Sequence, residues 1–76
     1  MNKKKLRSII YLYGDTCTIL AKYIGISYQR FSCKINEKDG AEFTQKEIAK
    51  IKEKYSLTPE EIDEIFFNQK VSKKDN

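Results

Sequence analysis

Apolar side chains recur at intervals of three and four residues along most of the chain, which is the spacing of amphipathic helices. The one strand-like run, IIYLY, has no second strand near it to pair with. The pattern therefore predicts an all-α protein, a compact bundle of five helices. The apolar stripes of these helices are Leu6, Ile9, Ile10 and Tyr13; Leu20, Ala21 and Ile24; Phe31 and Ile35; Ile48, Ile51 and Tyr55; and Ile62, Ile65 and Phe66.

Residues typical of helix ends separate the stripes. Gly14 and Gly25 favour helix termination, because glycine adopts the left-handed conformation at little cost. Each later helix follows a hydroxyl side chain that can accept a free backbone N–H at the helix start; these are Thr16, Ser27, Thr44 and Thr58. The predicted helices cover residues 3–13, 16–24, 27–35 and 44–55, with a fifth starting at Thr58, and a polar loop occupies residues 36–43.

The chain has 76 residues, of which 39% are apolar. This predicts one domain with one small core, ordered over about residues 3–69 and followed by a flexible tail at 70–76. No run approaches the roughly 18 apolar residues of a membrane span, and the apolar part after the basic start is too short for a signal peptide. We therefore expect a cytoplasmic protein without a membrane partner.

The residue types present exclude several classes of function. Cys17 and Cys33 are the only cysteines and there is no histidine, so the four ligands of a closed zinc site are missing. Histidine is also the commonest general base, and the chain has no loop of the kind that cradles phosphate. We therefore expect reduced cysteines, no metal or other cofactor, no small-molecule ligand and no enzymatic activity.

The net charge of +4 is unevenly distributed along the chain. Residues 1–34 carry seven basic side chains and one acid, Asp15, a net charge of +6, whereas residues 35–76 carry eight lysines and ten acids, a net charge of −2. A basic half suggests a side that faces a polyanion. The alternative is a lysine-rich surface that only keeps the protein in solution, and charge alone does not separate the two.

The segment AKYIGISYQRFSCKIN predicts a sharp corner between two helices. Gly25 would turn the chain, Ile26 would fill the corner, and Ser27 would start the next helix at a steep angle. Phe31 and Ile35 are four residues apart and would hold that helix against the core. This is the helix-turn-helix arrangement, in which the N-terminal residues of the second helix enter the major groove of DNA.

The outer face of this third helix suits contact with DNA. No carboxylate lies between Asp15 and Glu37, and phosphates repel carboxylates. Gln29 can pair with an adenine edge, Arg30 can reach guanine or phosphate, and Tyr28 can pack on a thymine methyl or bond a phosphate. The alternative is an ordinary solvated helix face. The predicted outer face comprises Tyr28, Gln29, Arg30, Ser32, Cys33 and Lys34.

The stretch TCTILAKYIGISYQRFSCKIN resembles the helix-turn-helix of the phage-repressor class, which includes lambda-type repressors, Cro proteins and regulators of the xenobiotic-response-element type. The later stretch FTQKEIAKIKEKYSLTPEEIDEIFF is similar to the fourth and fifth helices of small phage-encoded members, so the resemblance covers roughly residues 5–67. It implies a lambda-repressor-like fold, a phage or mobile-element origin, and a bacterial cytoplasm in which the bound protein lies on the nucleoid. The matching residues are Thr16, Leu20, Ala21, Gly25, Ile26, Ser27, Phe31, Lys34, Ile35 and Asn36.

The resemblance also implies DNA contacts by position. These are to phosphate by Thr16, Cys17 and Ser27, to bases by Tyr28, Gln29, Arg30 and Cys33, and to the DNA backbone by Asn36 and Lys38. Asn36 could instead cap the third helix. Two features depart from the family: Cys33 is a poor hydrogen-bonding reader, and the loop after the third helix carries Glu37, Asp39 and Glu42, which weaken phosphate contact.

We therefore predict a sequence-specific transcriptional regulator, a Cro-like repressor that binds a palindromic operator in double-stranded DNA as a homodimer. One reading helix contacts few base pairs, so a second copy about one helical turn away is expected. The predicted dimer interface is Ile65, Phe66 and Phe67, since one helix face cannot bury all three; alternatively, Ile65 and Phe66 close the core and Phe67 covers an edge. The alternative function is a protein-interaction module such as an antitoxin or adaptor.

Overall fold

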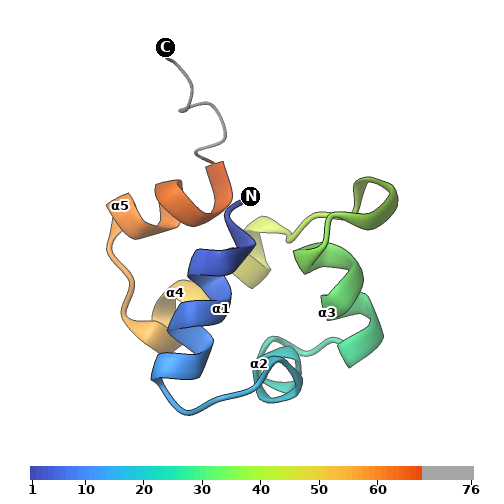
Figure 1. Ribbon diagram of the computed structural model, residues 1–76, viewed down its shortest axis with the longest axis horizontal. Coiled ribbons are helices and arrows are strands. Elements are labelled where there is room, and N and C mark those ends of the chain that lie inside the picture. The colour runs from blue at the N-terminus through green and yellow to red at the C-terminus, as the bar shows by residue number, and fades with distance from the viewer. Residues whose placement is uncertain (68–76) are drawn as a thin grey trace.

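Helices follow one another along residues 1–67, the part of the chain that the computed structural model describes, and these residues contain no strand (Figure 1). The predicted all-α bundle of five helices is confirmed, and the tail predicted at residues 70–76 lies outside the described residues. Two short turns are added, a 3-10 turn (η1) and a π-helical turn (η2) that continues the fifth helix. The elements are α1 (Lys3–Leu12), α2 (Cys17–Ile24), α3 (Tyr28–Ile35), η1 (Lys38–Gly40), α4 (Gln45–Tyr55), α5 (Pro59–Ile62) and η2 (Asp63–Phe67).

The second to fifth helices begin directly after their predicted capping residues. Thr16 Oγ1 accepts a hydrogen bond from the Ile19 N–H at 3.2 Å, which satisfies one of the free N–H groups at the start of α2. Thr44 and Thr58 each form a reciprocal capping box with the glutamate three residues later. The α1 helix ends at Leu12, one residue before the predicted position. Local sequence signals therefore place the helix starts correctly.

Each of the five helices contributes one side chain with no exposed surface to a single core. These five are Leu6, Leu20, Phe31, Ile51 and Ile65. The Phe43 ring joins the third and fifth helices, because its centroid lies 5.4 Å from that of Phe31 and 5.9 Å from that of Phe66. Burial of this apolar surface is the main term that stabilises a domain of this size.

Tyr13 departs from the predicted core stripe, since its side chain is 57% exposed. Its ring packs on the outside of Tyr55, with centroids 4.8 Å apart, and its hydroxyl donates to the Tyr55 carbonyl oxygen at 3.0 Å. A tyrosine can cover a buried ring and still present its hydroxyl to a backbone acceptor near water. Tyr13 therefore closes the edge of the core from the surface.

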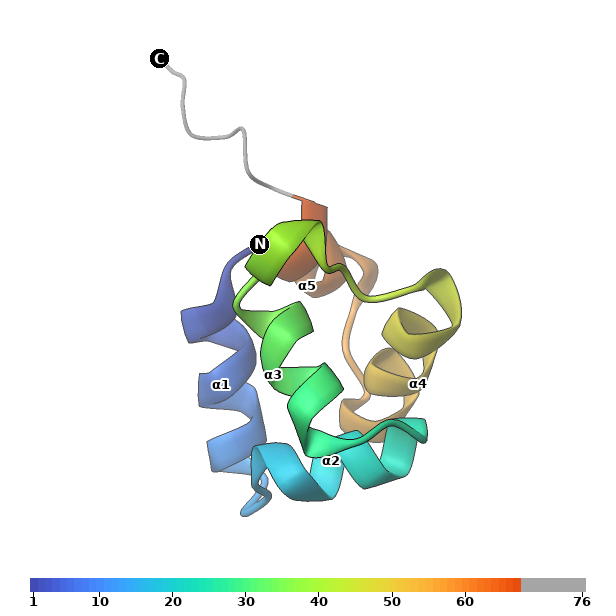
Figure 2. The same cartoon turned by 90° about the vertical axis from the view of Figure 1, so that its right-hand side faces the viewer.

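The arrangement of the helices leaves α3 at the surface of one side of the molecule. In Figure 2, α2 runs along the bottom and α3 rises from it between α1 and α4. The N-terminus lies beside the end of the fifth helix, where the Asn2 N–H donates to the Ile65 carbonyl oxygen at 2.7 Å. The inner side of α3 packs on the core while its outer side remains open.

Candidate nucleic-acid interface

The first turn of α3 presents three exposed side chains, Tyr28, Gln29 and Arg30. Gln29 and Arg30 point away from the side of the helix that buries Phe31 and Ile35. Tyr28 lies on the same side as Phe31 but is exposed, as the first residue of the helix. Ser32 and Cys33, which were predicted on the same outer face, are half-buried. A shallow groove runs along this side and is lined by Ser27, Gln29, Arg30, Cys33, Lys34 and Ala41.

The corner between α2 and α3 forms at the predicted residues. Gly25 has a φ of +88°, and its N–H and that of Ile26 both donate to the Ala21 carbonyl oxygen, at 2.9 Å and 3.0 Å. This closes α2 as glycine-terminated helices do. Ile26 packs half-buried against the core, and Ser27 Oγ accepts from the Arg30 N–H at 3.1 Å. The Ser27 cap thereby fixes the start of the exposed turn.

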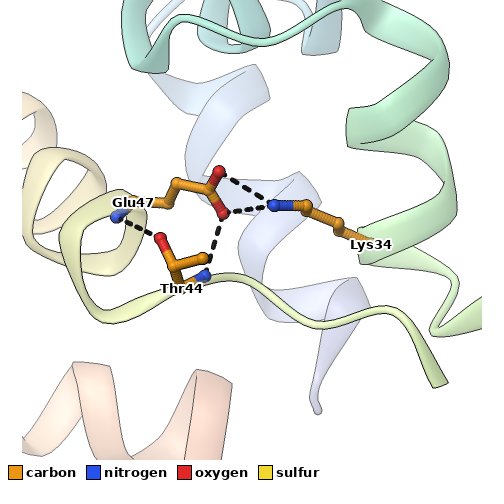
Figure 3. A network of polar contacts seen from close by, with 3 residues as sticks. All are labelled: Lys34, Thr44 and Glu47. Carbon is orange, nitrogen blue, oxygen red and sulfur yellow. Dashed lines mark hydrogen bonds and ion pairs between the residues drawn. The ribbon is translucent and has the colours of Figure 1, made fainter.

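The prediction that Lys34 lies on the outer face of α3 is wrong. Its side chain is buried, and its Nζ lies 2.7 Å and 2.8 Å from the two carboxylate oxygens of Glu47 (Figure 3). Glu47 Oε1 also accepts from the Thr44 N–H at 2.9 Å as part of the capping box of α4. Lys34 follows the buried Phe31 by three residues, so it lies on the inward side of the helix. Its charge is compensated within the protein rather than offered to a partner.

The Glu47 carboxylate is held in its charged form by this network. Burial raises the pKa of Glu47, but hydrogen bonds from Lys34 and Thr44 and the positive charge of Lys34 together outweigh burial. The pKa of Glu47 consequently lies below its ordinary value. The ion pair therefore persists at neutral pH and ties α3 to the first turn of α4.

Predicted contacts on either side of α3 have local structural roles. Asn36 caps α3, since its Nδ2 donates to the Ser32 carbonyl oxygen at 3.0 Å; the capping alternative is confirmed. Its Oδ1 accepts from Lys3 Nζ at 3.0 Å. Lys38 is exposed in η1. The neighbouring residues in the loop include the exposed acids Glu37, Asp39 and Glu42, so the loop remains a weak place for phosphate contact.

A second groove was not anticipated from the sequence. It brings the outer side of α1 next to the starts of α2 and α3, and it is lined by Arg7, Ile10, Tyr11, Asp15, Thr16, Cys17 and Tyr28. Thr16 is exposed and Cys17 is half-buried. The signal in the sequence was weak: Arg7 and Tyr11 are four residues apart, which puts them on one side of a helix but says nothing of what lies beside it.

Asp15, the only acid among residues 1–34, is paired with side chains of α4. Its Oδ2 accepts from the Tyr55 hydroxyl at 2.8 Å and lies 3.4 Å from Lys54 Nζ. Burial, followed by the hydrogen bond to Asp15, raises the pKa of Tyr55 well above its ordinary value, so the hydroxyl stays a donor. The one negative charge beside the second groove is therefore paired.

Two of the three residues predicted to form a dimer interface belong to the core. Ile65 has no exposed surface and Phe66 is 9% exposed, whereas Phe67 is 47% exposed. The alternative prediction, that Ile65 and Phe66 close the core, is confirmed. The prediction that these two residues form a dimer interface is wrong, because their side chains pack within the protomer. Phe67 alone among the three presents substantial apolar surface outward.

Within residues 1–67, no group of three or more His, Cys, Asp or Glu side chains could hold a metal ion, and both cysteines are free thiols. Over the same residues, no helix has the length and apolar character needed to cross a membrane. No family model, curated protein or solved structure matches the chain.

Proposed function

We propose that the chain is a sequence-specific DNA-binding regulator that uses α2, the corner and α3 as a helix-turn-helix. The observation that carries this proposal is the exposed first turn of α3, where Tyr28, Gln29 and Arg30 project from a helix without a carboxylate. An α-helix fits the major groove, and side chains of its first turns reach base edges. The family resemblance adds the role of a Cro-like repressor of phage or mobile-element origin.

The three side chains supply complementary chemistry for reading bases. The Gln29 amide both donates and accepts, as an adenine edge requires, and the Arg30 guanidinium can bond guanine or a phosphate. Tyr28 offers a ring for a thymine methyl and a hydroxyl for phosphate. Because Lys34 is paired with Glu47, Arg30 supplies the uncompensated positive charge of this face.

Binding as a dimer follows from the small footprint of one helix. A single α3 of eight residues reads few base pairs, so affinity and specificity require a second copy about 34 Å away along the DNA. Phe67, the exposed member of the predicted interface, is the residue that we assign to contact between copies. A palindromic operator is the DNA sequence that such a symmetric pair would recognise.

The test is selection of bound duplexes from a random-sequence pool, followed by binding titrations at several salt concentrations. A specific binder enriches a palindrome, loses affinity steeply as salt rises and keeps its preference for the operator over random DNA. Absence of any enriched sequence, with binding that salt hardly changes, would overturn the proposal.

A protein-interaction module, such as an antitoxin or adaptor, is the second candidate. The observation that favours it is exposed apolar surface away from the first turn of α3: Leu12 is 79% exposed, and Ile19 and Tyr23 are also exposed. Exposed apolar side chains of this size are a feature of protein-binding surfaces. The salt titration distinguishes the two candidates, since only DNA binding releases condensed counterions in the expected proportion.

A further inference from the structure

The outer side of α1 carries cations that the fold does not use. Of its four basic residues, Lys3 bonds the Asn36 side chain and Lys5 pairs with Glu64 at 3.4 Å. Lys4 and Arg7 are exposed and have no hydrogen-bond or ion-pair partner within residues 1–67. The helix contains no acid, so its free positive charge is not balanced on the same element.

This cationic side is continuous with the start of α3. Arg7 and Tyr11 line one shallow groove together with Thr16, Cys17 and Tyr28. Tyr11 is 84% exposed, the largest value among the exposed hydrophobic side chains of residues 1–67, and its hydroxyl is a donor at the edge of the groove. A ligand that touches Tyr28 can therefore touch α1 as well.

The electrostatics of the groove favour an anion. Asp15 is its only acidic lining residue, and its carboxylate already accepts a hydrogen bond from the Tyr55 hydroxyl and pairs with Lys54. The polar groups that the groove offers to a ligand are the Arg7 guanidinium and the hydroxyl groups of Tyr11, Tyr28 and Thr16. Arginine and hydroxyl donors are the groups that proteins most often direct at phosphate oxygens.

We propose that α1 is a backbone-contacting element, in which Arg7 and Tyr11 bind the sugar-phosphate strand that borders the major groove occupied by α3. This inference rests on the proposed function, because it requires duplex DNA against α3. Phosphates line both edges of the groove, so a surface adjoining the reading helix meets one of the two strands. The contact adds affinity without base preference. Lys4 lies one helical turn before Arg7 and Ser8, so it adds a second positive charge to the same side of α1.

The test compares Arg7→Gln with Lys50→Gln, which removes the same charge from the exposed side of α4, outside the groove. Arg7→Gln should lower the slope of log affinity against log salt by about 0.9, the value for one phosphate. The loss of DNA affinity caused by Arg7→Gln, relative to the parent protein, should therefore be about threefold smaller at 200 mM salt than at 50 mM salt. The loss should be equal for operator and random duplex, and Tyr11→Phe should weaken both without changing the slope.

The outcomes separate this inference from the function beneath it. If the parent protein binds no duplex DNA, the proposed function fails and the inference fails with it. If the parent binds but Arg7→Gln behaves as Lys50→Gln does, only the α1 contact is overturned. A changed base preference in Arg7→Gln, or tighter binding of the parent to RNA or anionic vesicles than to duplex DNA, also overturns it. Circular dichroism checks each variant for an intact helical fold, and Lys4→Gln provides a second charge variant on the same side of α1.

Discussion

Lys34 Nζ lies within 2.8 Å of both carboxylate oxygens of Glu47, and each side chain is about nine-tenths buried (Figure 3). This pair joins the last turn of α3 to the capping box of α4. The exposed first turn of α3 is thus carried by a helix whose other end is tied down by an ion pair. A buried pair of this kind contributes little when removed as a whole, but losing one partner leaves an uncompensated charge.

We expect Lys34→Met to destabilise the fold by about 3–5 kcal/mol, because the Glu47 carboxylate would stay buried without its cation. The double variant Lys34→Met/Glu47→Gln should lose clearly less than the two single variants add up to. Urea unfolding of the four proteins, followed by circular dichroism, measures the coupling. Strictly additive losses would mean that the two side chains do not stabilise one another.

Lowering the pH should reduce the stability of the fold, because the Glu47 carboxylate becomes protonated. The pKa of Glu47 is lower in the folded protein than its ordinary value of 4.5, so its contribution to stability is fully present above pH 4.5. It is lost as the pH falls below 4.5 through the folded-state pKa. The urea midpoint measured from pH 7 to pH 3 should therefore fall more steeply in the parent protein than in Glu47→Gln. Parallel pH profiles would contradict the assignment.

Gln29→Ala tests base reading by α3. We expect a loss of roughly 1–3 kcal/mol on the selected operator, relaxed preference at one base pair and unchanged stability, because Gln29 is exposed. Fluorescence anisotropy with operator duplexes substituted at each position measures both effects. Gln45→Ala, at the exposed first position of α4, is the matched control. A neutral Gln29→Ala would mean that α3 does not dock as proposed.

Phe67→Asp tests the contact between copies. Because Phe67 is 47% exposed, we expect the helices to remain intact while self-association and operator affinity fall. Sedimentation velocity measures association with and without operator. Leu12→Asp is the control for association without DNA, since it places the same charge at an exposed apolar position on α1. Unchanged association in Phe67→Asp would remove Phe67 from the interface. By contrast, Phe66→Asp should unfold the domain, because Phe66 is a core residue.

The features of the fold that the sequence predicted are local ones. Thr44 and Glu47 identify a helix start because both halves of a capping box lie within four residues. Phe31 and Ile35 identify the buried side of α3 because helical spacing depends only on neighbours along the chain. The turn at Gly25 belongs to the same class, since its left-handed conformation is a property of that residue. The candidate reading residues Tyr28, Gln29 and Arg30 followed from these positions, and their exposure agrees.

The sequence by itself determined the number of helices, their caps and most of the residues that each one buries. Only the tertiary structure decided which charges are free. Lys34 is neutralised by a glutamate 13 positions away, and Asp15 pairs with Lys54 and accepts a hydrogen bond from a tyrosine 40 positions away. It also decided that Arg7 and Tyr11 lie beside Tyr28. The physical reason is range, because caps and apolar stripes act within a turn or two of helix, whereas ion pairs and grooves depend on how separate helices pack.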